Sequence, residues 1–293
     1  EGGEAELAED SAVSEASLVV CVRALESRER GRRRGGVLVR YAHAVTPEHL
    51  VEVAPEALVE AQEISLDEAT GRLTARTQLR YGALVLEDEE AGTLDDAEAA
   101  RTLVRAARDR GLARFLDLDA LTSFERRVAF ARAHGAELDA VDDAAVDAAL
   151  ADLAWGRRNL KDLEGVDVVS ALRARMPGDH RAALARLAPV AVAIPGRRAV
   201  TVTYEVDRDP WIASRLQDFF GAADGPRVAG GRVPLVLHLL APNRRAVQVT
   251  TDLAGFWERH YPALRKELGR RYPKHAWPED PISAEPSRPR RRR

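Results

Sequence analysis

The sequence has few residues of the kinds that build covalent cross-links or span membranes. Its 293 residues include one cysteine, Cys21, which excludes an internal disulfide and any zinc site that needs several thiolates. Its longer apolar runs, such as Val233–Leu240, fall far short of the roughly 20 residues that a membrane-spanning helix requires. No basic segment followed by an apolar one opens the chain. We therefore expect a cytoplasmic protein with no membrane contact.

Lysine and methionine are also scarce, and the lack of lysine excludes one large class of enzymes. A nucleotide-binding P-loop needs a lysine directly after glycine, whereas Lys161, Lys266 and Lys274 follow leucine, arginine and proline. The sequence therefore contains no P-loop and no cofactor signature. Because the single methionine is Met176 and the chain opens at Glu1, we treat it as a fragment of a longer chain.

Other catalytic signatures are missing as well. There is no G-x-S-x-G nucleophile turn, no H-E-x-x-H pair and no cluster of cysteine and histidine. Asp67 and Glu68 imitate the acidic metal-binding motif of a helicase motor, but Thr70 and Gly71 follow them, so we interpret the segment as a tight turn. A hydrolase would need clustered acids and histidines, so we predict no catalytic residue and no metal ligand.

The composition is that of a globular protein with more than one core. The chain is 45% hydrophobic and 31% charged, with a formal net charge of -3. Charge is unevenly spread, because residues 1–190 carry a net -11 and residues 191–293 a net +8. An acidic partner would therefore bind the last third of the chain.

The hydrophobic pattern divides the chain into five segments and predicts an α+β fold. Residues 1–16 contain six acids and few large apolar side chains, which predicts a disordered tail or linker. Strand-like runs at 18–25, 37–45, 60–66 and 73–86, with a helix starting after Thr46, predict a small OB-like β-barrel over 17–92. Helical spacing predicts a helical domain or connector over 93–189.

The last third is predicted to be a mixed α+β domain over 190–281, followed by a basic disordered tail at 282–293. Alternation around Val200–Val206 predicts a strand, a short helix is expected from Trp211 to Phe220, and Leu235–Leu240 reads as a buried central strand that encloses His238. Asp252 is predicted to cap a helix. The tail ends in four arginines that would bind any polyanion.

Two basic surfaces are candidates for nucleic-acid contact. On the predicted strand after Gly71, side chains alternate, so Arg72, Arg76 and Arg80 share one face, where guanidinium donors suit phosphate and sugar. The second surface mixes cations with aromatic rings that could stack on bases. Either surface has an ordinary alternative, a solvated strand face for the first and a tryptophan that docks the chain terminus for the second. The candidates on the second surface are Arg265, Lys266, Arg270, Arg271, Lys274 and Trp277.

The C-terminal third resembles the C-terminal domain of the HrpB family of DEAH-box ATP-dependent RNA helicases. The match is strong over about 188–281 and looser before that; Ala246 and Ala276 stand where the family usually has proline. The larger departure is the absence of the motor domains. The segments that carry the resemblance are Gly230–Leu240, Val247–Thr250, Asp252–Trp257, Arg271–His275 and Trp277–Pro281.

The resemblance implies that this chain holds an OB-like part and a family-specific extension of a bacterial helicase. ATP, magnesium and NTP hydrolysis would belong to the absent motor domains, so the chain would be catalytically silent alone. Its implied role is to bind or guide single-stranded RNA or DNA beside the motor of the same parent chain. The alternative is a protein-interaction or scaffolding module that docks on a partner or on the motor.

Overall fold

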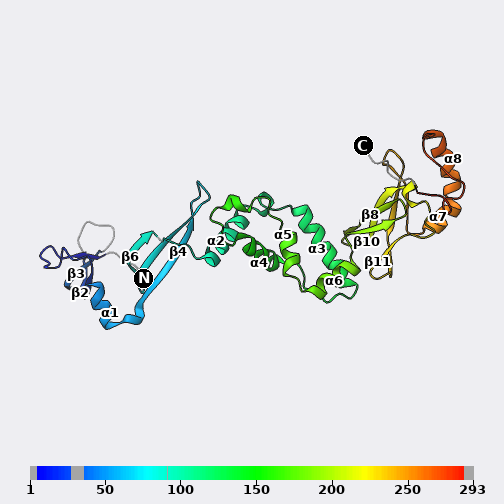
Figure 1. Ribbon diagram of the computed structural model, residues 1–293. Helices are drawn as coiled ribbons and strands as arrows, with labels where there is room; N and C mark the ends of the chain where they lie inside the picture. Colours follow the sequence, from blue (N-terminus) through cyan, green and yellow to red (C-terminus); the bar gives the residue numbers. More distant parts are fainter. Residues whose placement is uncertain (1–4, 28–35, 91, 287–293) are drawn as a thin grey trace. The chain divides into compact units, whose positions relative to one another are not determined.

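The computed structural model describes residues 5–27, 36–90 and 92–286. The chain divides into two compact units, one within residues 1–106 and 154–162 and the other within 107–153 and 163–293. Helices combine with several small sheets, none of which closes among the described residues, so the predicted α+β class is confirmed (Figure 1). In the part described, no helix is long and apolar enough to cross a membrane. Of the basic tail predicted at 282–293, residues 287–293 lie outside the described residues.

The first unit begins with a three-stranded sheet. Strands β2 (Val19–Ser27) and β3 (Gly36–Ala44) pair antiparallel, as the sequence predicts. The prediction of a disordered tail is wrong for Ala5–Leu7, which forms β1 and pairs parallel with β3. Backbone hydrogen bonds hold this strand, including one from the Ala8 N–H to the Val39 carbonyl at 3.2 Å. A polar composition indicates that few side chains of a segment can be buried. It does not reveal a strand that is held mainly by hydrogen bonds of its backbone.

A second three-stranded sheet follows a short helix. Thr46 precedes α1 (Pro47–Val53), with proline at the first helical position as predicted, and a 3₁₀ turn, η1 (Pro55–Ala57), leads into the sheet. The strands are β4 (Leu58–Leu66), β5 (Leu73–Tyr81) and β6 (Leu84–Glu90), in the order β4-β5-β6. Asp67 closes the β4–β5 turn by accepting hydrogen bonds from the Ala69 N–H and the Thr70 hydroxyl, each at 2.9 Å. The tight-turn interpretation of this acidic segment is confirmed.

The OB-like barrel predicted for 17–92 is not formed by the residues described there. They make two open sheets with no strand pairing between the sheets. A small barrel must fill its interior with side chains, yet among the described residues of this segment the buried apolar side chains are only Val39, Leu73 and Ala75. Alternating strand patterns predict half-buried strands, but they do not predict whether the first and last strands meet.

Helices make up the middle of the chain, as the spacing predicts. In α3, Asp117 caps the helix by accepting from the Ala120 N–H at 2.9 Å, and its buried side chains recur at helical spacing. The division into units differs from the predicted segment, because Leu73 N–H donates to the Arg158 carbonyl, and Leu160 N–H to the Gly71 carbonyl, both at 2.9 Å. The elements are α2 (Asp96–Asp109), η2 (Leu112–Arg114), α3 (Leu118–Ala133), α4 (Asp143–Ala154), η3 (Leu160–Leu163), α5 (Val168–Arg175) and α6 (Gly178–Leu187).

The last part of the second unit contains a four-stranded sheet in the order β14-β13-β10-β9, in which β10 and β13 run parallel. A hairpin of β7 and β8 contacts β10. The elements are β7 (Ala191–Ile194), β8 (Arg197–Thr201), β9 (Thr203–Glu205), β10 (Arg208–Arg215), η4 (Leu216–Phe219), β11 (Arg227–Val228), β12 (Val233–Pro234), β13 (Val236–Leu240), β14 (Ala246–Thr250), α7 (Leu253–Arg259) and α8 (Tyr261–Arg271).

The helix predicted from Trp211 to Phe220 is wrong. Its first half is strand β10, and only Leu216–Phe219 form a turn of 3₁₀ helix. Burial has a period of two in this strand, since Ile212 and Ser214 are buried whereas Trp211 and Ala213 are partly exposed. The alternation is hidden in the sequence because alanine and serine occupy positions on opposite faces.

An aromatic cluster fixes the two C-terminal helices. Asp252 caps α7 by accepting from the Gly255 N–H at 2.8 Å, and this bond holds the pKa of Asp252 below its ordinary value. Tyr261, at the start of α8, is fully buried and packs edge-on against Trp257 with ring centroids 5.2 Å apart. The Tyr261 hydroxyl donates to the Pro278 carbonyl at 2.8 Å, so the segment after α8 is anchored to the same core.

We expect this tyrosine to make the unit sensitive to alkali. Burial raises the pKa of Tyr261 to about 12, so the folded state resists ionisation that the unfolded state undergoes near pH 10. The free energy of unfolding should therefore fall by up to about 1.4 kcal/mol per pH unit between pH 10 and 12. Urea unfolding at pH 9, 10 and 11 measures this change. Tyr261→Phe should make the free energy of unfolding fall less steeply with pH, and the slope that remains would come from Tyr204, whose pKa is also raised by burial. Equal slopes for the two proteins would contradict it.

Candidate nucleic-acid interface

The first predicted surface lies on β5, which begins just after Arg72. Arg76 and Arg80 fall on one face of this strand as expected, but acids flank that face. Arg76 is opposite Glu63 on β4 and Glu90 on β6. Its Nε lies 2.7 Å from Asp88 Oδ1, and Arg80 Nη2 lies 3.6 Å from Glu63 Oε2. The face is thus a ladder of alternating charge, on which a phosphate would have to compete with carboxylates.

Gln78 provides a hydrogen-bond partner for one of the arginines on this face. It is buried, and its Oε1 accepts hydrogen bonds from Arg80 Nε at 2.9 Å and Nη2 at 2.5 Å. Arg72 is exposed and forms an isolated backbone bridge with Asn159. Two of the three predicted guanidiniums therefore already have partners within the sheet.

The structure divides the second predicted set into anchored and exposed residues. Arg265 Nη2 pairs with Glu279 Oε1 at 2.7 Å. Trp277 is half-buried, donates from Nε1 to the Tyr272 carbonyl at 3.1 Å, and would contact a Cβ at Gly269. These two side chains help to dock the segment after α8, which is the ordinary alternative considered for Trp277. Lys266, Arg270, Arg271 and Lys274 are instead exposed.

These four exposed cations form what we call the α8 cationic surface: Lys266, Arg270, Arg271 and Lys274. Lys266 and Arg270 are one helical turn apart and so share a face. The Arg271 guanidinium lies 5.8 Å from the centre of the Tyr272 ring. Among the residues that the structure describes, none of the four forms an ion pair with a carboxylate.

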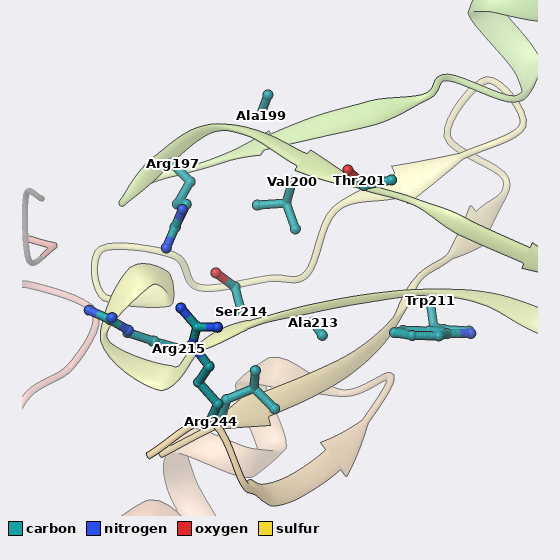
Figure 2. A pocket seen from close by; sticks show the side chains of 10 residues that line it. Arg197, Ala199, Val200, Thr201, Trp211, Ala213, Ser214, Arg215 and Arg244 are labelled. Carbon is teal, nitrogen blue, oxygen red and sulfur yellow. The ribbon is translucent and has the colours of Figure 1, made fainter. Parts of the chain in front are cut away.

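A cavity that the sequence analysis missed lies between the β7–β8 hairpin and the sheet of β10 and β13. Its volume is about 430 Å³. Figure 2 shows three arginines at one end and Trp211 at the other. The arginines come from β8, from the end of β10 and from the β13–β14 turn, so their proximity is invisible in the sequence. We call this site the arginine groove; its principal residues are Arg197, Trp211, Ser214, Arg215, Leu240 and Arg244.

A buried carboxylate organises the arginine end of the groove. The side chain of Asp218, on η4, is 6% exposed. Its Oδ2 accepts from the Ser214 hydroxyl at 2.6 Å, from Arg197 Nε at 3.1 Å and from the Arg215 N–H at 3.2 Å. The guanidinium of Arg197 is therefore held in place, while Arg215 and Arg244 are exposed and make no ion pair in the described part of the chain.

Comparison with known proteins defines the class of this fold. Residues 150–281 match the family described as ATP-dependent helicase C-terminal, a range that includes the arginine groove and the α8 cationic surface but not β5. The chain thus contains a domain of the helicase C-terminal class. More specifically, it belongs to the HrpB family and corresponds to the C-terminal region of these helicases.

The relatives are longer than this chain. The ATP-dependent RNA helicase HrpB of Escherichia coli strain K12 is 32% identical over 249 residues, which are 82% of this chain and 30% of that protein. The crystal structure of the E. coli DExH-box NTPase HrpB matches with a TM-score of 0.62 and 30% identity, over 95% of this chain and 35% of that chain. A structure of the E. coli DEAH/RHA helicase HrpB matches with a TM-score of 0.55 and 28% identity, over 93% of this chain and 34% of that chain.

Proposed function

We propose that this chain is the non-motor part of an HrpB-type ATP-dependent RNA helicase and that it binds or guides single-stranded nucleic acid in the cytoplasm. The observation that carries the proposal is the α8 cationic surface. Its four cations are exposed and lack ion pairs among the described residues, whereas the arginines of β5 face carboxylates.

Free cations of this kind suit phosphate. A cation that has no ion pair within the protein breaks no salt bridge when it binds a phosphate. The counterions that the nucleic acid then releases also favour binding. Lys266 and Arg270 follow one ridge of the helix, and Lys274 lies just beyond its end. Glu267 is the acid that interrupts this surface within α8. Such a surface gives affinity and position, but not sequence specificity.

Charge reversal of the α8 cationic surface tests the proposal. The Lys266→Glu, Arg270→Glu double variant should lower the affinity for a fluorescein-labelled single-stranded RNA by at least about tenfold at low salt, because two phosphate contacts become repulsive. Glu267→Lys on the same helix should raise the affinity. Fluorescence anisotropy measures both, with Arg290–Arg293 replaced by serine throughout so that the terminal arginines do not contribute. RNA affinity that is unaffected by either change would refute the proposal.

We further propose that the chain has no catalytic activity alone. The sequence has no P-loop, and within the described residues no group of three or more His, Cys, Asp or Glu side chains is arranged to hold a metal ion. ATP and magnesium would then be bound by the motor domains of the parent chain.

Docking on the motor domains, or on another protein, is a second candidate function that one observation favours. The first unit exposes large apolar side chains on its strands and on α1, with Val22 71%, Tyr41 62% and Val53 81% exposed. A partner that covered these side chains would remove their apolar surface from water, which favours association. This role concerns the first unit, so it is compatible with nucleic-acid binding by the second.

A further inference from the structure

The floor of the arginine groove is a partly exposed sheet face. Trp211, Ala213 and Arg215 alternate with buried residues of β10, so all three point to the same side. The parallel register sets Ala213 beside His238 of β13. His238 is half-exposed rather than enclosed as predicted, and its ring centroid lies 4.7 Å from that of Trp211. Two aromatic rings therefore lie on this face.

The charge of the groove is positive at one end. Arg197, Arg215 and Arg244 bring three guanidiniums, and the carboxylate that pairs with Arg197 belongs to the buried Asp218. Asp218 is largely removed from solvent, so it positions Arg197 without presenting an accessible negative charge to a ligand. On β5, by contrast, Asp88 and Glu63 are themselves 37% and 63% exposed and accompany their arginines at the surface.

The backbone supports this end of the groove. Arg244 is held in the left-handed region, with φ of 65°, in a turn closed by hydrogen bonds between Ala241 and both Arg244 and Arg245. Gly196 lets the β7–β8 hairpin approach η4, since its N–H donates to the Asp218 carbonyl at 2.8 Å. The backbone of Arg244, and that of Gly196 next to Arg197, is thus fixed by hydrogen bonds, which reduces the loss of backbone freedom when a ligand binds.

We propose that the arginine groove binds one stretch of single-stranded nucleic acid, with phosphates at Arg197, Arg215 and Arg244 and a base against Trp211. A partly exposed aromatic ring in the same groove as cations suits an unpaired base, whose face is free to stack, and not a duplex. The volume of about 430 Å³ falls within the ~300–1,000 Å³ range of small-ligand sites. The inference rests on the proposed function and adds a site that is separate in sequence from the α8 cationic surface.

The experiment compares arginines that line the groove with arginines of the same unit that do not. Arg244→Glu should lower the affinity for a single-stranded RNA about tenfold or more at low salt and reduce the dependence of binding on salt. Arg245→Glu, at the next position but outside the groove, should change the affinity little. Arg215→Glu, inside the groove, and Arg198→Glu, outside it, form a second pair of variant and control. Trp211→Ala should cost about fivefold or more, whereas Trp211→Phe should retain most of the affinity. Circular dichroism of each variant controls for folding.

The outcomes separate this inference from the proposed function. If the chain with Arg290–Arg293 replaced by serine binds no RNA, the proposed function fails. If it binds RNA and the α8 variant weakens binding while Arg244→Glu, Arg215→Glu and Trp211→Ala do not, the groove inference alone is overturned. Competition by an acidic peptide as effective as that by unlabelled RNA, with no effect of Trp211→Ala, would also overturn it, because it would show that charge and not a base is recognised.

Discussion

Replacing Asp218 with alanine is expected to lower the free energy of unfolding of the second unit by about 2–4 kcal/mol. The carboxylate is buried and accepts three hydrogen bonds. Its removal leaves the buried Ser214 hydroxyl and the Arg215 N–H without that acceptor, and each unsatisfied buried donor costs about 1–3 kcal/mol. Urea unfolding followed by tryptophan fluorescence measures the change, since Trp211, Trp257 and Trp277 lie in this unit.

Two control variants identify the source of the loss. Ser214→Ala removes a single donor and should cost less than Asp218→Ala. Arg197→Ala removes a half-exposed partner, which solvent partly screens, and should cost less still. If Arg197→Ala proved as damaging as Asp218→Ala, the ion pair rather than the buried hydrogen bonds would hold this end of the groove.

Gly196→Ala is expected to cost about 2 kcal/mol or more and to weaken RNA binding. A Cβ at this position would lie 2.6 Å from the Asp218 Cα and 2.9 Å from its carbonyl oxygen, and both are backbone atoms that cannot rotate away. The hairpin would have to withdraw from η4, which lengthens the hydrogen bond from the Gly196 N–H and displaces Arg197 next to it. Thermal unfolding and RNA anisotropy of the same variant measure the two effects.

Gly178→Ala is the matched control. Gly178 opens α6 without a positive φ, and the nearest atom to its Cβ would be a guanidinium nitrogen of Arg181 at 3.9 Å. Alanine should therefore be neutral or slightly stabilising there, because it has the higher helix propensity. A loss of stability at Gly178 equal to that at Gly196 would show that the close approach to η4 is not the cause.

The sequence predicts those parts of the fold that depend on local patterns. The strands β2 and β3, the proline-initiated α1 and the Asp252 cap of α7 all rest on nearby residues and are found where expected. The pairing of Ala5–Leu7 with β3 and the absence of a closed barrel depend on contacts between distant strands. A strand with alanine and serine at alternating positions, such as β10, carries too weak a pattern to be separated from a helix.

The same limit applies to the candidate site. Alternation along β5 correctly places Arg76 and Arg80 on one face, but the acids that oppose them lie on other strands, so the sequence overstates the positive charge there. For Trp277, the structure favours the docking role that the sequence left open. The arginine groove was missed because its residues lie on separate elements, and the charge excess of the last third of the chain was its only signal in the sequence.

Photo-cross-linking would show directly whether folded surfaces of the second unit contact single-stranded RNA. A single-stranded RNA with 5-iodouridine is irradiated with the full chain, and mass spectrometry identifies the cross-linked peptides. We expect cross-links within Trp211–Arg215 and within Lys266–Trp277. Cross-links confined to the terminal arginines, or to β5, would contradict this expectation.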